Sequence, residues 1–263
     1  MKFSIWPNSE RPWTEVRDLA TEIENMGWDG LWYADHYMPN TPDGEPIGGD
    51  MHECFSILSA LAATTSRIRL GSLVTPTTMN HPALIANRAA TIDRISNGRF
   101  VLGMGAGWQI NEHTAFGIEL FGNKDRVDRF AEAIEITSRM LRLTARFAQE
   151  WNTWGPPEGA GQVMQKLREA CDKEGRDINT MRKSVQALFF VTPDEASAEK
   201  LKTKVPMERS IVGTTSQIVD AIGQYVDQGF DEVCVPDFTL GGSAAQRLDA
   251  YGSIWANIAS QFQ

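Results

Sequence analysis

Cysteine, histidine and long apolar runs are all scarce in this sequence of 263 residues. The three cysteines, Cys54, Cys171 and Cys234, are far apart and odd in number, which fits a reduced cytoplasmic protein better than a disulfide scaffold. The four histidines show no HExxH or comparable ligand spacing, so we expect no metal site. No stretch approaches the ~20 apolar residues of a spanning helix, and the opening MKFSIWPNSE has too short an apolar run for a signal peptide.

Positive charge is also in deficit. Lysine and arginine number 25 against 34 acidic residues, which gives a formal net charge of −9. This balance argues against a nucleic-acid surface and against an anionic membrane as a partner. The hydrophobic content of 42% is enough for a sizeable core. A chain of this length suits one large α/β domain, because barrels of roughly 250 residues are ordinary single units.

Short apolar runs alternate with helical patterns along the chain. We expect strands at 2–6, 30–34, 68–74, 100–102, 150–154, 184–191 and 232–235. We expect helices between them, with a second helical piece at 142–148 and a closing helix at 244–262. This alternation predicts a parallel sheet with helical crossovers.

Two architectures fit that alternation, an open doubly wound sheet and a (β/α) barrel. Polar residues follow the predicted strands repeatedly, at Asp35-His36, Thr75, 107–112, Asn152 and Asp237. A barrel collects all its strand ends on one face, whereas an open sheet uses mainly those beside its switch point. The pattern favours a TIM-type (β/α) barrel in which one strand is missing, forming a single domain over 1–263.

The stretch GRFVLGMGAGWQINEH, residues 98–113, resembles one wall of a ligand site. A short apolar run leads into Gly103, Gly105 and Gly107, and amide and acidic side chains follow. Glycines let a ligand approach bare backbone, although tight packing in a barrel would require them equally. The run is not a complete GxGxxG, because position 108 is tryptophan, so it is a weak nucleotide signal.

Several blocks together resemble the luciferase-like monooxygenase superfamily. They are WPNSERPW, GWDGLWYADHYMP, the segment from RIRLGSLVTP to HTAFGI, EWNTWG and DEVCVPDFTLG. The resemblance is strongest to the coenzyme F420-dependent oxidoreductases of actinobacteria, and it covers nearly the whole chain. It implies a luciferase-like barrel that binds a deazaflavin, or alternatively FMN, at the carboxyl ends of its strands.

The resemblance also implies roles for individual residues. His36 would act in proton transfer. The bond between Ser72 and Leu73 would correspond to a non-proline cis peptide found in the family. In the related sugar-phosphate dehydrogenases a catalytic glutamate stands where this chain has Trp108, so their full mechanism does not transfer. The expected cofactor-binding residues are Asp35, Ser72, Leu73, Thr75, Gly105, Gly107, Trp108 and Asn111.

One region departs from the family pattern. Family members usually carry an insertion, a fifth strand and a phosphate-holding glycine pair after the helix that here ends near Leu141. In this chain the sequence runs directly into LTARFAQEWN. The loss corresponds to about one βα unit of a (β/α)₈ barrel. A naturally shortened homologue, a truncated chain and a sequence with omitted residues would each explain it.

Some of these residues also have simpler structural interpretations. Asp35-His36 could hydrogen-bond a loop, and a local structural role for Glu112-His113 is favoured over catalysis. Gly213-Thr214 before a helix suits a helix cap better than a phosphate site.

The function that the sequence favours is hydride transfer between F420 and an unknown small organic substrate. An FMN-dependent monooxygenase and a non-catalytic flavin-binding homologue are the alternatives. A homodimer is expected by analogy with the family.

Overall fold

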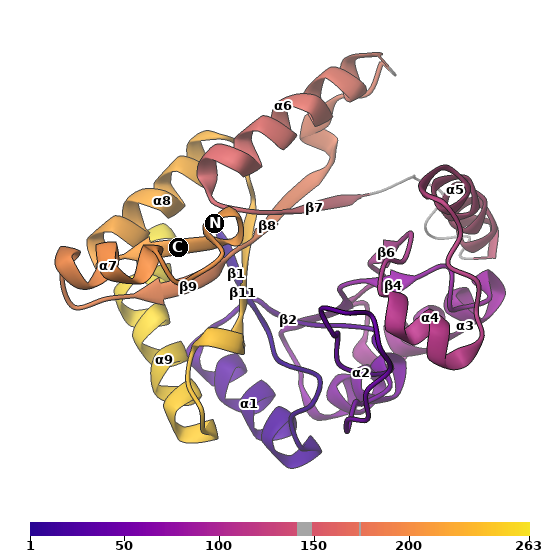
Figure 1. The fold of residues 1–263 in the computed structure, drawn as a ribbon, viewed down its shortest axis with the longest axis horizontal. Coiled ribbons are helices and arrows are strands. Elements are labelled where there is room, and N and C mark those ends of the chain that lie inside the picture. The colour runs from indigo at the N-terminus through magenta and orange to yellow at the C-terminus, as the bar shows by residue number, and fades with distance from the viewer. Residues whose placement is uncertain (141–148, 174) are drawn as a thin grey trace. The chain divides into compact units, whose positions relative to one another are not determined.

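The computed structural model describes residues 1–140, 149–173 and 175–263. The described residues fall into two compact units. We call them the C-terminal unit, which holds Met1–Trp6, Asn25–Asp29 and the described residues from 149 onward, and the N-terminal unit, which holds Pro7–Glu24 and Gly30 to Met140. Figure 1 shows their elements from indigo to yellow along the chain. The expected single domain over 1–263 stays a prediction.

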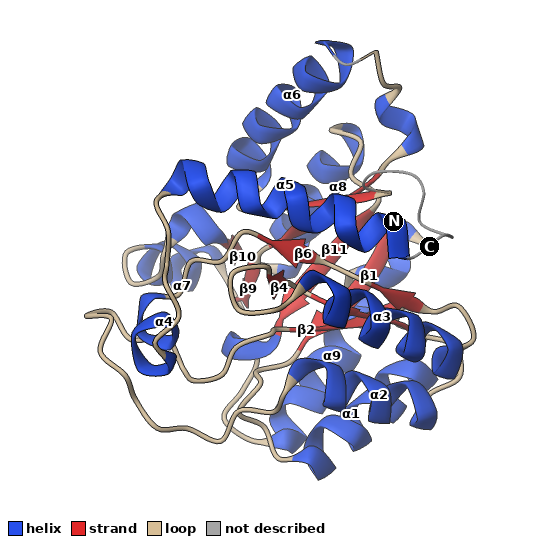
Figure 2. Cartoon of the chain, turned by 90° about the vertical axis from the view of Figure 1, so that its right-hand side faces the viewer, coloured by secondary structure: helices blue, strands red, loops and turns tan. Residues whose placement is uncertain are grey.

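The N-terminal unit contains three parallel strands in the order β5-β3-β2. They are β2 (Gly30–Tyr33), β3 (Arg69–Ser72) and β5 (Phe100–Val101), and a second parallel pair joins β4 (Thr75–Pro76) to β6 (Met104–Gly105). The helices are α1 (Trp13–Met26), α2 (Cys54–Thr64), α3 (Pro82–Ser96), α4 (Ile110–Phe116) and α5 (Asn123–Met140). Helices α2 and α3 pack side by side, as Figure 2 shows.

Local sequence signals account for the order of these elements. Every residue of β2 is buried, as a strand covered on both faces requires. Helix α3 starts at Pro82 and ends at Ser96, and its C-cap Asn97 adopts the left-handed conformation with φ 57°. The Arg99 guanidinium then donates hydrogen bonds to the carbonyls of Ala62, Thr65 and Ile68, so one side chain ties the end of α2 to the start of β3.

The C-terminal unit contains four parallel strands in the order β1-β11-β8-β7. They are β1 (Lys2–Trp6), β7 (Glu150–Trp154), β8 (Arg182–Gln186) and β11 (Glu232–Pro236). A parallel pair joins β9 (Leu188–Val191) to β10 (Ser210–Gly213). The helices are α6 (Pro157–Lys173), α7 (Glu195–Lys202), α8 (Thr215–Asp227) and α9 (Ala244–Asn257).

Each of the seven predicted strands overlaps an observed strand, but the predictions were incomplete, and the two-residue strands β4 and β6 were not predicted. The run 184–191 is two strands, β8 and β9, which are separated at Ala187. Strand β10 was missed, because its four residues carry no alternation that would mark them as a strand. The closing helix ends at Asn257 and is followed by a 3₁₀ turn, Ala259–Phe262. The helical piece predicted at 142–148 lies outside the described residues.

Within the described ranges, none of the helices is long and apolar enough to cross a membrane.

Candidate functional site

Polar residues that follow strands β2, β4 and β6 come together within the N-terminal unit. His36 and Tyr37 follow β2, Asn80 follows β4, and Asn111 and Glu112 lie at the start of α4. Side-chain hydrogen bonds connect these three segments. The unit therefore gathers an imidazole, carboxyl groups and amides in one place.

The imidazole of His36 is paired with a buried carboxyl group. Its Nδ1 lies 3.0 Å from Oε1 of Glu112, and the same oxygen accepts the backbone N–H of Tyr37 at 2.8 Å. Glu112 is 2% exposed, whereas the His36 side chain is 24% exposed. The Trp108 indole lies edge-on to the imidazole, with ring centroids 5.7 Å apart, and is itself largely exposed. His36 therefore has one side held by protein and another open to a reactant.

Asp35 is buried beside this pair. Asn80 Nδ2 donates to Asp35 Oδ2 at 3.3 Å, and Asn80 in turn accepts from Arg88. Burial raises the pKa of Asp35 from 3.8 to about 7, with Glu53 and Glu112 adding to the rise and His36 and Arg88 opposing it. A substantial fraction of Asp35 is therefore a neutral carboxylic acid near pH 7, and in that form it can donate a hydrogen bond.

Two buried amides hold the loop that follows His36. Asn111 Nδ2 donates to the carbonyl of Pro39 at 2.8 Å, and Gln109 Nε2 donates to the carbonyl of Met38 at 2.9 Å. The Oδ1 atom of Asn111 accepts the N–H of Glu112. These bonds give the buried side-chain amide of Asn111 partners within the protein, so its burial needs no ligand to explain it. Its contact with a cofactor stays a prediction.

Ser72, Leu73 and Thr75 lie where strand β3 passes into β4. The hydroxyl of Ser72 pairs with the backbone of Gly103, and the N–H of Leu73 donates to the carbonyl of Tyr33 at 2.8 Å. The Thr75 hydroxyl is buried and has no hydrogen-bond partner among the described residues. A buried orphaned hydroxyl is unusual, and a bound group could satisfy it.

The cis peptide expected between Ser72 and Leu73 lies one bond later. The structure has it between Leu73 and Val74. The physical reason is that the Leu73 N–H still bonds the neighbouring strand, so the chain leaves the β3 ladder only after Leu73. The resemblance therefore located the feature to within one residue.

The glycines of the 98–113 stretch are explained by a neighbouring segment of chain. An added Cβ at Gly103 would lie 2.1 Å from the Ser72 carbonyl oxygen, and one at Gly105 would lie 2.5 Å from Val74 Cγ2. Gly107 has φ +79°, and its added Cβ would lie 2.2 Å from Thr78 Oγ1. Close packing against residues 72–78 requires these glycines, and cofactor contact by Gly105 or Gly107 stays a prediction.

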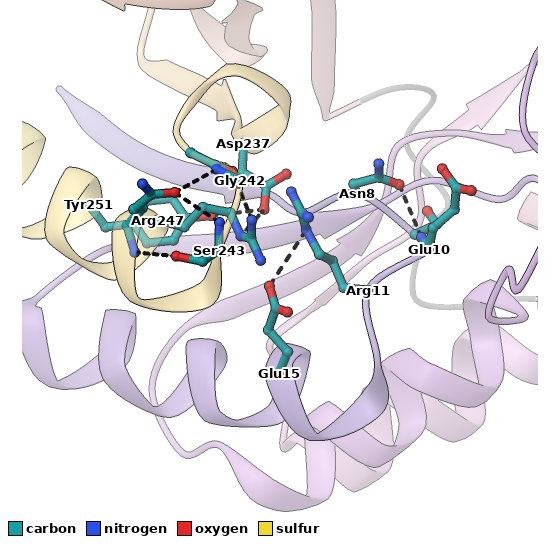
Figure 3. Close-up of polar contacts among 12 residues, drawn as sticks. Asn8, Glu10, Arg11, Glu15, Asp237, Gly242, Ser243, Arg247 and Tyr251 are labelled. Atoms are coloured by element: carbon teal, nitrogen blue, oxygen red, sulfur yellow. Dashed lines mark hydrogen bonds and ion pairs between the residues drawn. The ribbon is translucent and has the colours of Figure 1, made fainter.

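The polar residues at the strand ends of the C-terminal unit form hydrogen bonds and an ion pair with other residues of that unit. The Asn152 Nδ2 donates to the Ser184 hydroxyl at 2.8 Å. Arg247 and Tyr251 of α9 meet the buried carboxyl of Asp237, with the Tyr251 hydroxyl 3.1 Å from Oδ2 (Figure 3). Thr214 forms a capping box with Gln217, which confirms the predicted helix cap. We assign structural roles to these residues.

The sequence did not reveal the pairing of His36 with Glu112. The two residues are 76 positions apart, and no local pattern connects them. The sequence analysis favoured a local structural role for Glu112 and His113. That role fits His113, whose ring nitrogens lie 2.8 Å from the Gln109 carbonyl and 2.9 Å from the Thr78 hydroxyl. In the described part of the chain, no three His, Cys, Asp or Glu side chains are placed to hold a metal ion.

Comparison with known proteins gives one family. The family model described as luciferase-like monooxygenase matches residues 1–142. An F420-dependent glucose-6-phosphate dehydrogenase of Kineococcus radiotolerans is 34% identical over 127 residues, 48% of this chain but only 36% of the relative. An F420-dependent glucose-6-phosphate dehydrogenase of Microbacterium testaceum is 37% identical over 312 residues, covering 90% of this chain and 91% of the relative. The chain thus spans about a third of the former relative and most of the latter.

The alignment with the Microbacterium protein also bears on the shortened region. It extends over 312 positions, more than the 263 residues of this chain, so that relative has residues which this chain lacks. The match to the family model stops at residue 142, where the sequence predicts the loss.

Solved structures similar along the full chain include an F420-dependent enzyme and a monooxygenase. A coenzyme F420-dependent tetrahydromethanopterin reductase from Methanopyrus kandleri has a TM-score of 0.76, 17% identity and coverage of 100% of this chain and 99% of its own. The monooxygenase RslO1 from Streptomyces bottropensis has a TM-score of 0.77, 17% identity and full coverage of both chains. At such identity these likenesses show the fold alone, and they confirm the predicted luciferase-like (β/α)-barrel class.

Proposed function

Because this chain belongs to the luciferase-like monooxygenase family, we propose that it is an oxidoreductase using coenzyme F420. It transfers a hydride between the deazaflavin and a small organic substrate. The observation that carries the proposal is His36, an imidazole backed by the buried Glu112 and partly open to solvent. The Microbacterium relative supports the choice of cofactor, because it is named as F420-dependent and the alignment covers most of both chains.

The residues of the N-terminal unit fit such a cofactor. The orphaned Thr75 hydroxyl offers a hydrogen bond to a ring substituent, and the neutral form of Asp35 can donate another. When bound, F420 supplies the carbon that gives or accepts the hydride. The residues that we propose to hold it are Asp35, Ser72, Leu73, Thr75, Gly105, Gly107, Trp108 and Asn111.

His36 moves the proton that accompanies the hydride. Oxidation of an alcohol releases a proton from the oxygen as the hydride leaves the carbon, and reduction of a carbonyl requires one at that oxygen. A histidine suits this exchange because its charge changes between pH 5 and 8. The indole of Trp108 contacts the imidazole at right angles, with ring centroids 5.7 Å apart.

The substrate of this chain is not a sugar phosphate in our proposal, although two relatives carry that substrate in their names. Where the related sugar-phosphate dehydrogenases have a catalytic glutamate, this chain has Trp108, an apolar ring beside His36. A tryptophan at the mouth of the site favours apolar or planar substrates, such as secondary alcohols, ketones or conjugated carbonyl compounds.

Two alternative functions differ from the proposal, one in its cofactor and the other in lacking turnover. An FMN-dependent monooxygenase is the alternative that the family description supports. A non-catalytic flavin-binding homologue would keep the fold and lose turnover along with the missing βα unit. Cytoplasmic localisation and a homodimer complete the proposal, supported by the free, buried cysteines Cys54, Cys171 and Cys234 and by family analogy respectively.

The test is F420-linked turnover by the purified protein on a panel of alcohols, ketones, enones and glucose 6-phosphate. We expect turnover with F420 on an apolar member of the panel and none with FMN. The variant His36→Ala loses turnover, whereas His81→Asn, which changes an exposed helix cap to another good cap, retains it. Turnover with FMN alone, or unchanged turnover by His36→Ala, contradicts the corresponding part of the proposal.

A further inference from the structure

Glu112 has a second function beyond holding a loop. We propose that it is a positioning residue that fixes the tautomer of His36, so that Nε2 is the nitrogen which exchanges the proton with the substrate. The proposal rests on the proposed function for its role in the reaction. Its structural part concerns the protein alone and can be tested without a cofactor.

One oxygen atom of Glu112, Oε1, faces both the Tyr37 backbone and the His36 ring. Oε1 of Glu112 accepts the backbone N–H of Tyr37 at 2.8 Å, and a backbone N–H can only donate. The same Oε1 faces Nδ1 of His36 at 3.0 Å. An oxygen that already accepts from one side, and belongs to a carboxylate, accepts from the imidazole as well. Nδ1 therefore carries a hydrogen.

The other ring nitrogen of His36, Nε2, is free to contact a substrate. Within the described chain, Nε2 of His36 makes no hydrogen bond, and Trp108 meets the ring edge-on without supplying a polar partner. With Nδ1 protonated, the neutral ring has its lone pair at Nε2. That is the nitrogen available to take a proton from an alcohol and to return it to a carbonyl.

The carboxylate of Glu112 also acts once His36 has taken the proton. The imidazolium is then a donor at both nitrogens, and Glu112 provides a negative charge at hydrogen-bond distance. Asp35, the preceding residue, also interacts electrostatically with the His36 ring, and Glu53 and Arg88 in turn act on Asp35. Of these groups, only Glu112 is hydrogen-bonded to the ring, and at 2% exposure water does not screen it.

A purely structural Glu112 would bind the Tyr37 N–H and leave the tautomer of His36 to solvent. The structural role and the positioning role of Glu112 predict different tautomers of His36, that is, a different nitrogen carrying the hydrogen in the neutral ring. Long-range proton–nitrogen correlation spectra of protein labelled with ¹⁵N-histidine report it directly. The three other histidines are assigned by substitution.

We expect His36 to carry its hydrogen on Nδ1 in the wild-type protein. In Glu112→Ala the ring loses its acceptor, and the signal shifts toward the Nε2-protonated form. F420-linked kcat falls on the order of 100-fold with KM nearly unchanged, because the lost interaction acts in the transition state. Glu119→Ala, which removes an exposed acid just beyond the same helix, is the matched control and changes neither signal nor kcat.

Glu112→Gln serves if the alanine variant does not fold. It keeps an acceptor for the Tyr37 N–H and removes the charge, so it folds and its kcat falls while KM is retained. A wild-type ring protonated on Nε2, a tautomer unchanged in Glu112→Ala, or an undiminished kcat in both folded variants overturns the positioning role. If the wild-type protein shows the expected tautomer but no F420 turnover, the proposed function fails, and with it the role of Glu112 in the reaction.

Discussion

Asp35 provides a pH-dependent test of the site. Its carboxyl group is 2% exposed, and burial together with the acidic neighbours Glu53 and Glu112 raises its pKa from 3.8 to about 7. The folded protein therefore binds a proton at Asp35 that the unfolded chain releases above pH 4. By linkage, stability falls as the pH rises from about 4 to about 7, and the loss is complete above that range.

The size of this loss of stability follows from the rise in the pKa of Asp35. One pKa unit corresponds to about 1.4 kcal/mol, so a rise of about three units costs the wild-type protein on the order of 4 kcal/mol at pH 8. Asparagine at this position cannot ionise, and it has nearly the same size. Asp35→Asn should therefore gain stability relative to wild type as the pH rises, and the two proteins should differ little in this respect at pH 4.

The assay is urea denaturation of both proteins at pH 4, 6 and 8, with the free energy of unfolding extrapolated to water. We expect the stability difference between Asp35→Asn and wild type to increase by several kcal/mol across that range. Asp43→Asn, which changes an exposed acid of the neighbouring loop, is the control and should show no such increase. A difference for Asp35→Asn that is independent of pH would refute the reasoning.

Three further substitutions test contacts that stabilise the fold. For each, the loss of stability is measured from the midpoint of denaturant unfolding. Gly103→Ala places a Cβ against the Ser72 carbonyl and should cost about 3 kcal/mol, whereas Gly122→Ala, with open space around it, should cost little; equal costs would contradict the packing explanation. Arg99→Lys cannot reproduce the bonds to several carbonyls and should cost about 3 kcal/mol, and a neutral result would show that this tie is dispensable. Thr214→Ala removes a helix cap and should cost about 1 kcal/mol, with no loss expected if the cap bond is not formed in solution.

Much of the fold could be predicted because its elements carry strong local signals. The fully buried strand β2 reads as an apolar run, and the Asn97-Gly98 pair marks the end of α3. The break at Ala187 and the strand β10 could not be predicted, since both depend on which strands pair and not on local composition. The resemblance to a family supplied the cis peptide region, with an error of one bond.

The candidate site was less predictable than the fold. His36 and Asp35 were identified from their place after a strand, but the contact with Glu112 crosses 76 positions and depends on the tertiary structure. For the glycines at 103, 105 and 107 the sequence left open either ligand approach or tight packing, and the structure shows residues 72–78 packed beside them. A glycine in the sequence indicates a close approach and leaves open what approaches.

The central claim is that this chain binds coenzyme F420, and titration of F420 fluorescence with the purified protein tests it most directly. We expect saturable quenching that is retained by His36→Ala and weakened by Thr75→Val, which removes only the orphaned hydroxyl. FMN should not displace the bound F420. Absence of quenching in a folded preparation, or binding of FMN in preference to F420, would contradict the claim.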